Sequence, residues 1–361
     1  MTDPSPDPEI VHVVSVRTVR ITQPDSATPL VIGHRGAPGH RPEHTLASYE
    51  LAARAGADFI EPDLVITADG VLVARHEPEI GATTDVASRP EFADRRTTKT
   101  IDGVSRTGWF VEDFTLAELR TLRAIERIPH LRPGNATYDG RFAIPTFAEI
   151  LTLREQLSRR LGREIGVYPE TKHPSYFAGL GLPLEPALVT ELETYDLNRP
   201  EAPVFVQSFE TTNLRLLREQ LRVPIVQLLA PDGAPADLAA SGDRRCYSDL
   251  ATPAGLREIA TYADAIGAEK DLVVAREPDG SLGAPTGLVE AAHDAGLAVH
   301  AYTFRNESAF LPANLRRGAA ADHGDAVTEY EVFLRAGVDG VFSDHPDTAV
   351  LARDLVAARA A

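Results

Sequence analysis

Two acidic residues on one predicted strand could hold a metal ion. Side chains alternate along a strand, so Glu61 and Asp63 of the strand expected at residues 58–66 point to one face. Ile60 and Leu64 point to the opposite, apolar face. Two buried carboxylates repel each other and lose their hydration, and a divalent cation with oxygen ligands is the usual compensation. A pair of surface carboxylates on an edge strand is the alternative, which the apolar flanking residues disfavour.

A third carboxylate and a lysine follow the same pattern on a later strand. Glu170 and Lys172 share a face at the end of the strand expected at residues 164–172. Glu170 would complete a site for a hard metal ion, and Lys172 would offset negative charge or contact a phosphate. A structural ion pair between the two residues is the alternative.

Two histidines and an arginine lie at strand ends. His34, Arg35 and Gly36 come directly after the first strand, and His76 ends the hairpin that begins with the strand of Glu61. A pair of histidines can act as general base and general acid. Arginine is a bidentate donor to phosphate, and glycine lets the backbone pass close to a ligand. A lone histidine is more often structural, so this interpretation depends on the nearby carboxylates.

Short apolar runs alternate with amphipathic stretches from Leu30 onward, which predicts a series of β/α units. A return strand at residues 71–75 forms a hairpin with the second strand. Eight units predict an α/β fold, a (β/α)8 TIM barrel; a doubly wound open sheet is the alternative, because strand order is not visible in a sequence. The expected strands cover residues 30–33, 58–66, 164–172, 204–209, 224–229, 265–267, 298–304 and 338–343, and the expected helices cover residues 45–55, 147–161, 184–195, 214–221, 256–262, 287–295, 330–336 and 348–358.

One segment interrupts this alternation. Residues 77–145 follow the return strand and contain one clear helical pattern, at 116–124. A structureless loop of that length is improbable within a domain, so we predict an inserted subdomain over the C-terminal face of the barrel, where active sites form. Residues 27–76 and 146–361 then form the catalytic barrel, and residues 1–26 form an acidic, Pro-rich, solvated tail.

The composition disfavours several classes of function. The 361 residues include 53 Asp and Glu against 36 Lys and Arg, a formal net charge of −17, which disfavours binding to nucleic acid or to anionic membrane surfaces. One cysteine, Cys246, permits no intrachain disulfide and no cysteine-based zinc site. We expect no transmembrane segment, because no apolar run is long enough, and the N-terminal residues lack the pattern of a signal peptide.

The stretch from His34 to Thr45 resembles the signature of the glycerophosphodiester phosphodiesterase family. That signature has His-Arg-Gly, a short loop, and Pro-Glu-Asn/His-Thr at the start of a helix. The chain looks most like the long-insertion, periplasmic-type bacterial members, and it has Glu77, His44 and Tyr302 where many members have Asp, Asn and Trp. The resemblance continues in the family's order through Glu61-Pro62-Asp63, His76-Glu77, Thr84-Asp85-Val86, Glu170-Thr171-Lys172, Gln207-Ser208-Phe209, Val226-Gln227-Leu228, His300 to Arg305 and Gly340 to Asp344.

The resemblance implies a barrel of the phospholipase-C-like phosphodiesterase type that hydrolyses small-molecule glycerophosphodiesters to sn-glycerol 3-phosphate and an alcohol. It implies a divalent cation as cofactor, Ca²⁺ in preference to Mg²⁺. It also implies a location outside the cytoplasm, whereas the missing signal pattern favours the cytoplasm if the start is native. By position, the implied roles are acid–base catalysis for His34 and His76, metal binding for Glu61, Asp63 and Glu170, phosphate binding for Arg35 and Lys172, and lining of the substrate pocket for Glu43, Gln207, Phe209 and Tyr302.

The expected mechanism uses the two histidines in opposite roles. We expect His34 to deprotonate the nucleophile and His76 to protonate the leaving alcohol. The nucleophile is the adjacent glycerol hydroxyl, which gives a cyclic phosphate that water opens, or it is water itself. Alternative substrates on the same scaffold are lysophospholipids, in a phospholipase D-type reaction, phosphatidylinositol and glycerophosphate polymers. A binding protein without catalysis is disfavoured, because such proteins usually lack a histidine or a metal ligand that this chain retains.

Overall fold

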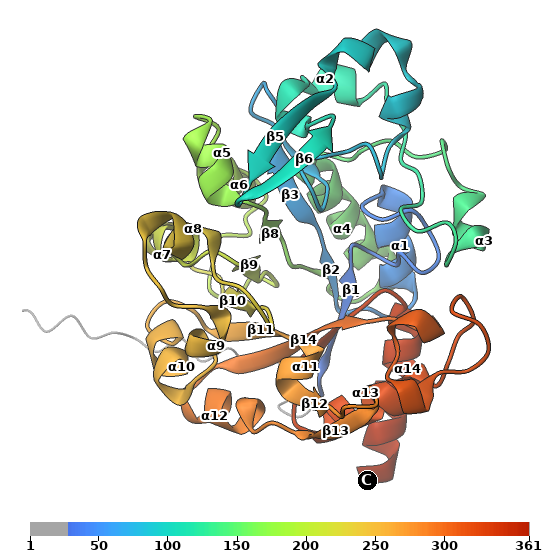
Figure 1. Ribbon diagram of the computed structural model, residues 1–361, viewed down its shortest axis with the longest axis vertical. Helices are drawn as coiled ribbons and strands as arrows, with labels where there is room; N and C mark the ends of the chain where they lie inside the picture. Colours follow the sequence, from blue (N-terminus) through green and yellow to red (C-terminus); the bar gives the residue numbers. More distant parts are fainter. Residues whose placement is uncertain (1–27, 361) are drawn as a thin grey trace, which may run out of the picture.

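The structure, a computed structural model, describes residues 28–360, and a barrel of eight parallel strands lies at its centre (Figure 1). The predicted tail at residues 1–26 lies outside the described residues. Two of the eight strands, expected to be continuous, are each broken at a proline, which has no N–H to donate to the sheet. β2 (Phe59–Glu61) and β3 (Asp63–Ile66) flank Pro62, and β7 (Gly166–Val167) and β8 (Glu170–Thr171) flank Tyr168-Pro169.

The pairing of the strands closes the ring. β1 (Leu30–His34) pairs in parallel with β2 on one side and with β15 (Gly340–Ser343) on the other. The two pieces of the second strand pair with the two pieces of the third. This cyclic order confirms the predicted (β/α)8 barrel and contradicts the doubly wound open sheet. The remaining strands follow in chain order between β8 and β15: β9 (Val206–Ser208), β10 (Ile225–Leu229), β11 (Ala265–Glu269) and β14 (Ala298–Phe304).

Helices cover the outside of the barrel and pack their apolar faces on the strands. The first long one shows why they form where they do. α4 (Phe147–Leu161) begins at a capping box of Thr146 and Glu149 and ends at Gly162, whose φ of 65° few other residues adopt. The other helices that follow the barrel strands are α1 (Leu46–Arg54), α6 (Glu185–Thr194), α7 (Thr211–Gln220), α10 (Pro253–Ile259), α12 (Leu288–Asp294), α13 (Ala326–Arg335) and α14 (Pro346–Ala360).

Aromatic side chains fill the interior of the barrel below its C-terminal rim. Phe59, Tyr168, Phe205 and Phe342 form this inner core, and the rings of Tyr168 and Phe205 stack with centroids 4.9 Å apart. The Tyr168 hydroxyl bonds to His300 Nδ1 at 2.7 Å, which satisfies its buried polar group. Above this layer the inward side chains become charged, so the apolar core forms the floor of a polar chamber.

The segment at residues 77–145 lies between β4 (Leu72–Ala74), which is antiparallel to β3, and α4. Its first part is drawn in cyan tones at the top of Figure 1, and its later part, with α3, lies lower down on the right. Its main regular structure is a hairpin of β5 (Thr97–Ile101) and β6 (Val104–Gly108). The hairpin turn is Asp102-Gly103, both with positive φ, as two-residue hairpin turns favour. The segment also contains α2 (Leu116–Leu119), α3 (Pro133–Ala136) and 3-10 turns at Asp85–Ser88, Pro90–Arg95 and Val111–Asp113.

The helix predicted at residues 116–124 is wrong in its length. α2 begins at a capping box of Thr115 and Glu118 but ends at Leu119. Beyond it the backbone pairs with other segments: the Arg123 carbonyl accepts from the Asp85 amide at 2.9 Å, and the Ala124 amide donates to the Phe142 carbonyl at 2.8 Å. These bonds to distant segments replace the ones that would have extended the helix.

Several short elements on loops were not predicted from the sequence, because each has too few residues for a periodic pattern. These elements are α5 (Pro174–Gly179), α8 (Ala236–Ser241), α9 (Tyr247–Leu250), α11 (Lys270–Val273), β12 (Val274–Arg276), β13 (Leu282–Pro285) and 3-10 turns at Ser308–Phe310 and Ala313–Leu315.

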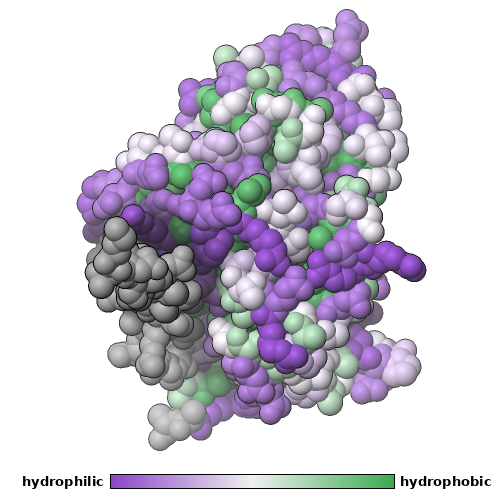
Figure 2. All heavy atoms as spheres, turned by 90° about the vertical axis from the view of Figure 1, so that its left-hand side faces the viewer, coloured by the Kyte–Doolittle hydropathy of each residue, from purple (hydrophilic) through white to green (hydrophobic). Residues whose placement is uncertain are grey.

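Within the described residues, no helix is both long and apolar enough to cross a membrane. Figure 2 shows mainly hydrophilic side chains, interspersed with smaller hydrophobic areas, on one face.

Candidate active site

A pocket of about 310 Å³ opens at the C-terminal ends of the barrel strands. Most of the candidate residues converge there, although they come from different strands. Asp63 and Glu43 do not line the pocket and lie buried next to residues that do. The predicted residues that line it are His34, Arg35, Glu61, His76, Glu170, Lys172, Gln207, Phe209 and Tyr302.

Three buried carboxylates meet at one side of this pocket. Each of Glu61, Asp63 and Glu170 offers an oxygen atom, and these atoms lie within 4.8 Å of one another. Sheet register brings them together, because Asp63 of β3 lies directly opposite Glu170 of β8. Burial and the neighbouring carboxylates raise the pKa of Glu61 well above its usual value. Burial also raises the pKa of Glu170, to about 8, although Lys172 opposes this rise.

Lys172 and His44 compensate Asp63 more fully than the other two carboxylates are compensated. His44 Nε2 bonds to Asp63 Oδ2 at 2.9 Å, and Lys172 Nζ, which lies 2.8 Å from Glu170, also acts on Asp63. Burial alone would raise the pKa of Asp63, but the Lys172 charge and the His44 hydrogen bond hold it well below its usual value. The set of three buried, mutually repelling carboxylates, all oxygen donors, fits a hard divalent cation. Its two members with raised pKa would gain most from that charge.

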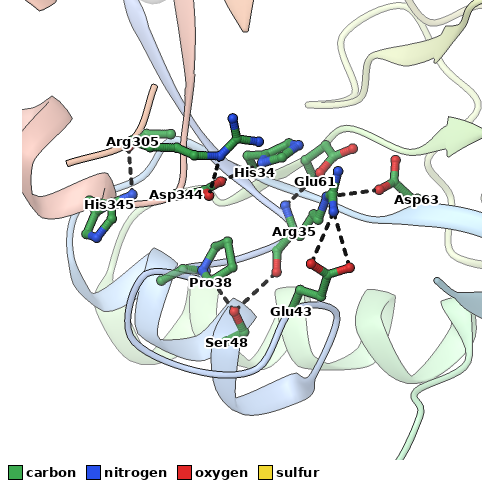
Figure 3. Close-up of polar contacts among 12 residues, drawn as sticks. His34, Arg35, Pro38, Glu43, Ser48, Glu61, Asp63, Arg305, Asp344 and His345 are labelled. Atoms are coloured by element: carbon green, nitrogen blue, oxygen red, sulfur yellow. Dashed lines mark hydrogen bonds and ion pairs between the residues drawn. The ribbon is translucent and has the colours of Figure 1, made fainter. Parts of the chain in front are cut away.

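The carboxylate of Asp344, 310 positions later in the sequence, orients His34. His34 Nδ1 lies 2.6 Å from Asp344 Oδ1, so Nε2 is the nitrogen available for proton transfer. Burial, helped by the Arg35 charge, lowers the pKa of His34 to about 4. Asp344 also accepts hydrogen bonds from Arg132 at 2.6 Å and Arg305 at 2.9 Å. Figure 3 shows His34 beside Asp344, with Arg305 above them.

His76 reaches the same chamber by a different path. β3 continues beyond the rim, and β4 runs back along it until the Arg75 amide bonds to the Asp63 carbonyl at 2.9 Å. The next residue, His76, is therefore level with the carboxylates. Its Nδ1 lies 3.1 Å from Glu77 Oε1. Burial, with the charges of Arg35 and Lys172, lowers the pKa of His76 to about 3, so both histidines are neutral at pH 7.

Arg35 occupies a tight turn after β1 and joins several groups of the site. Arg35 and Gly36 have φ values of 55° and 91°, and a Cβ on Gly36 would lie 2.5 Å from Ser48 Oγ, which explains the glycine. The Arg35 amide donates to Glu61 Oε2 at 2.7 Å, and its guanidinium donates to Glu43 at 3.1 Å. Glu43 therefore contacts Arg35 instead of forming the pocket wall that the sequence predicted.

The predicted pocket residues Gln207, Phe209 and Tyr302 lie on the wall. Gln207 Nε2 donates to Glu61 Oε1 at 3.2 Å, and the Tyr302 hydroxyl donates to the Leu229 carbonyl at 2.8 Å. The rings of Phe209 and Tyr302 pack edge to face with centroids 6.1 Å apart. They contribute aromatic surface to the lining of the pocket.

Sequence reasoning missed several residues at this site. Asp344 closes the motif Gly340 to Asp344 after the last strand, so its place at a strand end was the available signal. His44 stood out only as a departure from the family pattern, although it bonds directly to Asp63. Arg132 lies in the segment 77–145 and Arg305 follows β14, and nothing in their local sequence links them to His34.

Comparisons with known proteins found relatives that match most of the chain. The model described as "Glycerophosphoryl diester phosphodiesterase family" matches residues 34–348. The relative "Glycerophosphodiester phosphodiesterase GDPD6" of Arabidopsis thaliana is 34% identical over 332 residues, which cover 88% of this chain and 84% of that protein. A glycerophosphodiester phosphodiesterase of Haemophilus influenzae is 29% identical and covers 89% of this chain and 88% of its own.

Solved structures show the same fold. A phosphodiesterase of Oleispira antarctica, in complex with the product sn-glycerol-3-phosphate, has a TM-score of 0.57 and 21% identity, and covers 91% of this chain and 97% of its own. A glycerophosphoryl diester phosphodiesterase of Parabacteroides distasonis has a TM-score of 0.53 and 18% identity, and covers 92% of this chain and 88% of its own.

Proposed function

Because this chain belongs to the glycerophosphoryl diester phosphodiesterase family, a family of phosphodiester hydrolases, we propose that it hydrolyses glycerophosphodiesters to sn-glycerol 3-phosphate and an alcohol. The observation that carries the proposal is the meeting of two neutral histidines, three buried carboxylates and two cationic side chains in one chamber. Hydrolysis of a phosphodiester needs a base, an acid and compensation of negative charge, and this set supplies all three.

The two histidines would move the protons. His34 accepts the proton of the attacking hydroxyl at Nε2, because Asp344 occupies Nδ1 and stabilises the imidazolium that forms. His76 donates a proton to the oxygen of the leaving alcohol. The negative charge of a bound phosphodiester favours the protonated form of a nearby histidine, which counteracts the low pKa of His76 in the free protein. The attacking hydroxyl belongs to the glycerol moiety or to water.

Glu61, Asp63 and Glu170 would hold the divalent cation, for which we favour Ca²⁺ over Mg²⁺. Such an ion supplies Lewis-acid polarisation of phosphate and hydroxyl oxygens when it is bound. Arg35 and Lys172 would contact the phosphate oxygens. Each is already near a carboxylate, Glu43 and Glu170 respectively, which fixes its position before the substrate arrives.

A turnover screen tests this proposal. The protein is incubated with glycerophosphocholine, glycerophosphoethanolamine or glycerophosphoglycerol, and released sn-glycerol 3-phosphate is measured after treatment with a chelator and after addition of Ca²⁺ or Mg²⁺. We expect turnover with an added cation and its loss with the chelator. Absence of sn-glycerol 3-phosphate with every substrate and cation would contradict the function. Full turnover in the chelator would contradict the metal requirement alone.

A further inference from the structure

A second groove of about 780 Å³ begins where the catalytic pocket ends. His76, Lys172 and Phe209 line both spaces, so the groove continues directly from the proposed site. Of the two histidines, His76 borders the groove, whereas His34 borders the pocket alone. A phosphodiester bound between the histidines would therefore have one of its two substituents on the side of His76, facing this groove.

The walls of the groove are apolar and aromatic over much of their length. One wall is α8 with its neighbouring loop, which presents Ala236, Ala239 and Ala240. The rings of Phe209 and Tyr247 also line it and pack edge to face with centroids 6.0 Å apart. Such walls suit a substituent with exposed C–H surface.

Most charged groups that line the groove already have partners of opposite charge. Lys172 contacts Glu170 at 2.8 Å, and His173 contacts Asp102 at 2.5 Å. Glu77 contacts His173 Nε2 at 3.6 Å and Arg106, which is outside the groove lining, at 3.3 Å, and it also lies 3.1 Å from Nδ1 of the neutral His76. These groups therefore offer little uncompensated charge to a ligand.

Glu210 differs from these groups. Glu210 lines the groove but is only 3% exposed, and no basic residue of the described chain lies within ion-pair distance of it. It accepts hydrogen bonds from the Ser175 amide, at 3.2 Å, and from the Ser175 hydroxyl. Burial, with the charges of Asp102 and Asp237, raises the pKa of Glu210 to about 7. A buried carboxylate without a counter-ion is costly, and a cation in the groove would remove that cost.

We propose that this groove binds the leaving alcohol of the substrate and that Glu210 selects alcohols that carry an ammonium group. A carboxylate beside an aromatic ring is an arrangement that binds organic cations through charge and cation–π attraction. Tyr247 supplies that ring beside Glu210, because Lys172 Nζ already lies 5.6 Å from the centroid of the Phe209 ring. The inference rests on the proposed function, because it assigns the substituent on the His76 side to the alcohol that leaves. It makes Glu210 a specificity residue that takes no part in the chemical step.

The test compares substrates with cationic and neutral alcohols. Values of kcat/KM are measured for glycerophosphocholine and glycerophosphoglycerol with the wild type, with Glu210→Gln and with Glu219→Gln. Glu219 is exposed on α7, which begins directly after Glu210, and it lies outside the groove lining. We expect the wild type and Glu219→Gln to prefer the cationic substrate about tenfold, and Glu210→Gln to lose that preference through a higher KM for glycerophosphocholine.

The neutral substrate separates specificity from damage to the fold. Glu210→Gln should hydrolyse glycerophosphoglycerol as fast as the wild type. An unchanged substrate ratio in Glu210→Gln, or a wild type that prefers the neutral alcohol, would overturn the groove assignment while the hydrolase function stands. An equal loss on both substrates would also overturn it, because Glu210 would then be structural.

A binding measurement tests the groove without catalysis. Titration calorimetry with choline alone should give saturable binding to the wild type and to Glu219→Gln, and at least about tenfold weaker binding to Glu210→Gln. This result would support the groove even if no glycerophosphodiester were hydrolysed, in which case the proposed function alone fails. Equal choline binding by wild type and Glu210→Gln, or binding by neither, would overturn the inference.

Discussion

His34 and His76 both have a pKa well below the ordinary value of a histidine side chain. Burial is the main reason that the pKa of His34 falls to about 4 and that of His76 to about 3, and the Arg35 charge lowers both further. A lowered pKa means that the folded protein favours the neutral ring at neutral pH. Each ring also has a carboxylate at Nδ1, Asp344 for His34 and Glu77 for His76, which sets its orientation.

Replacing either histidine should remove proton transfer without removing the fold. We expect His34→Ala and His76→Ala each to lower kcat by about 10²–10⁴-fold, the usual contribution of a general acid or base. Thermal unfolding should change little. His293→Ala is the control, because His293 is 43% exposed and bonds to Asp339 away from the pocket. Turnover close to that of the wild type in either active-site variant would contradict the assignment of acid–base catalysis to that histidine.

The carboxylate cluster predicts an unusual response to metal. Glu61→Gln replaces a buried carboxyl group whose charged form is disfavoured by burial and by the neighbouring carboxylates, so at neutral pH the metal-free variant should unfold at a higher temperature than the metal-free wild type. Added Ca²⁺ should stabilise the wild type, by about 2.7 kcal/mol at a hundred times Kd, and should stabilise the variant far less.

Calorimetric unfolding with and without Ca²⁺ measures both effects of Glu61→Gln. Glu201→Gln, an exposed carboxylate, should behave as the wild type does. Equal Ca²⁺ stabilisation of wild type and Glu61→Gln would be evidence against the cluster as the metal site.

At the scale of elements, prolines and strand ends determine where the residues of the candidate site lie. Pro62 and Pro169 interrupt two neighbouring strands just before Asp63 and Glu170, and the sheet register then sets these carboxylates opposite each other. The extension of β3 and the return of β4 bring His76 back to the same level. One hairpin thus positions residues at both of its ends.

Helix α6 contains a carboxylate whose burial predicts a pH-dependent stability. Burial raises the pKa of Glu191 to about 7 from the ordinary 4.5. The folded state therefore holds its proton more tightly than the unfolded state, and stability from this group is lost as pH rises from about 4.5 to about 7. Glu191→Gln should unfold like the wild type at pH 4.5 and be about 1–2 kcal/mol more stable at pH 8, after allowance for residual solvent contact.

Urea unfolding at the two pH values measures this difference. Glu193→Gln, on the exposed side of the same helix, should show no difference at either pH. A Glu191→Gln variant that is stabilised equally at pH 4.5 and pH 8 would show that lost charge at Glu191 is not the cause.

At the scale of the molecule, the segment 77–145 is joined to the catalytic chamber by buried charge. Arg132 of this segment is 5% exposed and donates to Asp344 at 2.6 Å, to Glu307 at 2.6 Å and to the Pro38 carbonyl at 2.9 Å. The net charge of −17 describes the whole chain, whereas the chamber lining sets Arg35, Lys172 and Arg305 beside the carboxylates of Glu61 and Glu170. A small anionic substrate therefore meets this local combination of charges and not the net charge of the chain.

Removing Arg132 should weaken catalysis through His34. Arg132→Met leaves Asp344 with one partner fewer, so we expect kcat to fall about tenfold or more with little change in KM, and stability to fall by about 3–5 kcal/mol. Arg132→Lys should restore part of kcat. Arg120→Met, an exposed residue of the same segment that pairs with Glu149, should change neither. A wild-type kcat in an Arg132→Met protein of reduced stability would mean that Arg132 has a structural role alone.

The sequence by itself determined the fold class and most of the candidate site. Strand and helix periodicity is local, so the eight β/α units were readable, and the alternation of side chains along a strand placed Glu61 and Asp63 on one face. The roles assigned to these residues stay predictions. The hairpin turn at Asp102-Gly103 was also readable, because Asp-Gly favours a two-residue turn, although the prediction for residues 77–145 did not include it.

Only the tertiary structure decided which distant residues meet. Asp344 bonds to His34 across 310 positions of sequence, and Arg132 reaches Asp344 across 212. Within the part of the chain that the structure describes, no basic residue lies within ion-pair distance of Glu210, and its hydrogen bonds come from Ser175 of α5, 35 positions earlier. Such contacts depend on the closure of the barrel and the docking of the segment 77–145, and no local propensity encodes either. Residue types therefore fixed which chemistry is available, and burial and long-range contacts fixed the charge and orientation of the groups that can perform it.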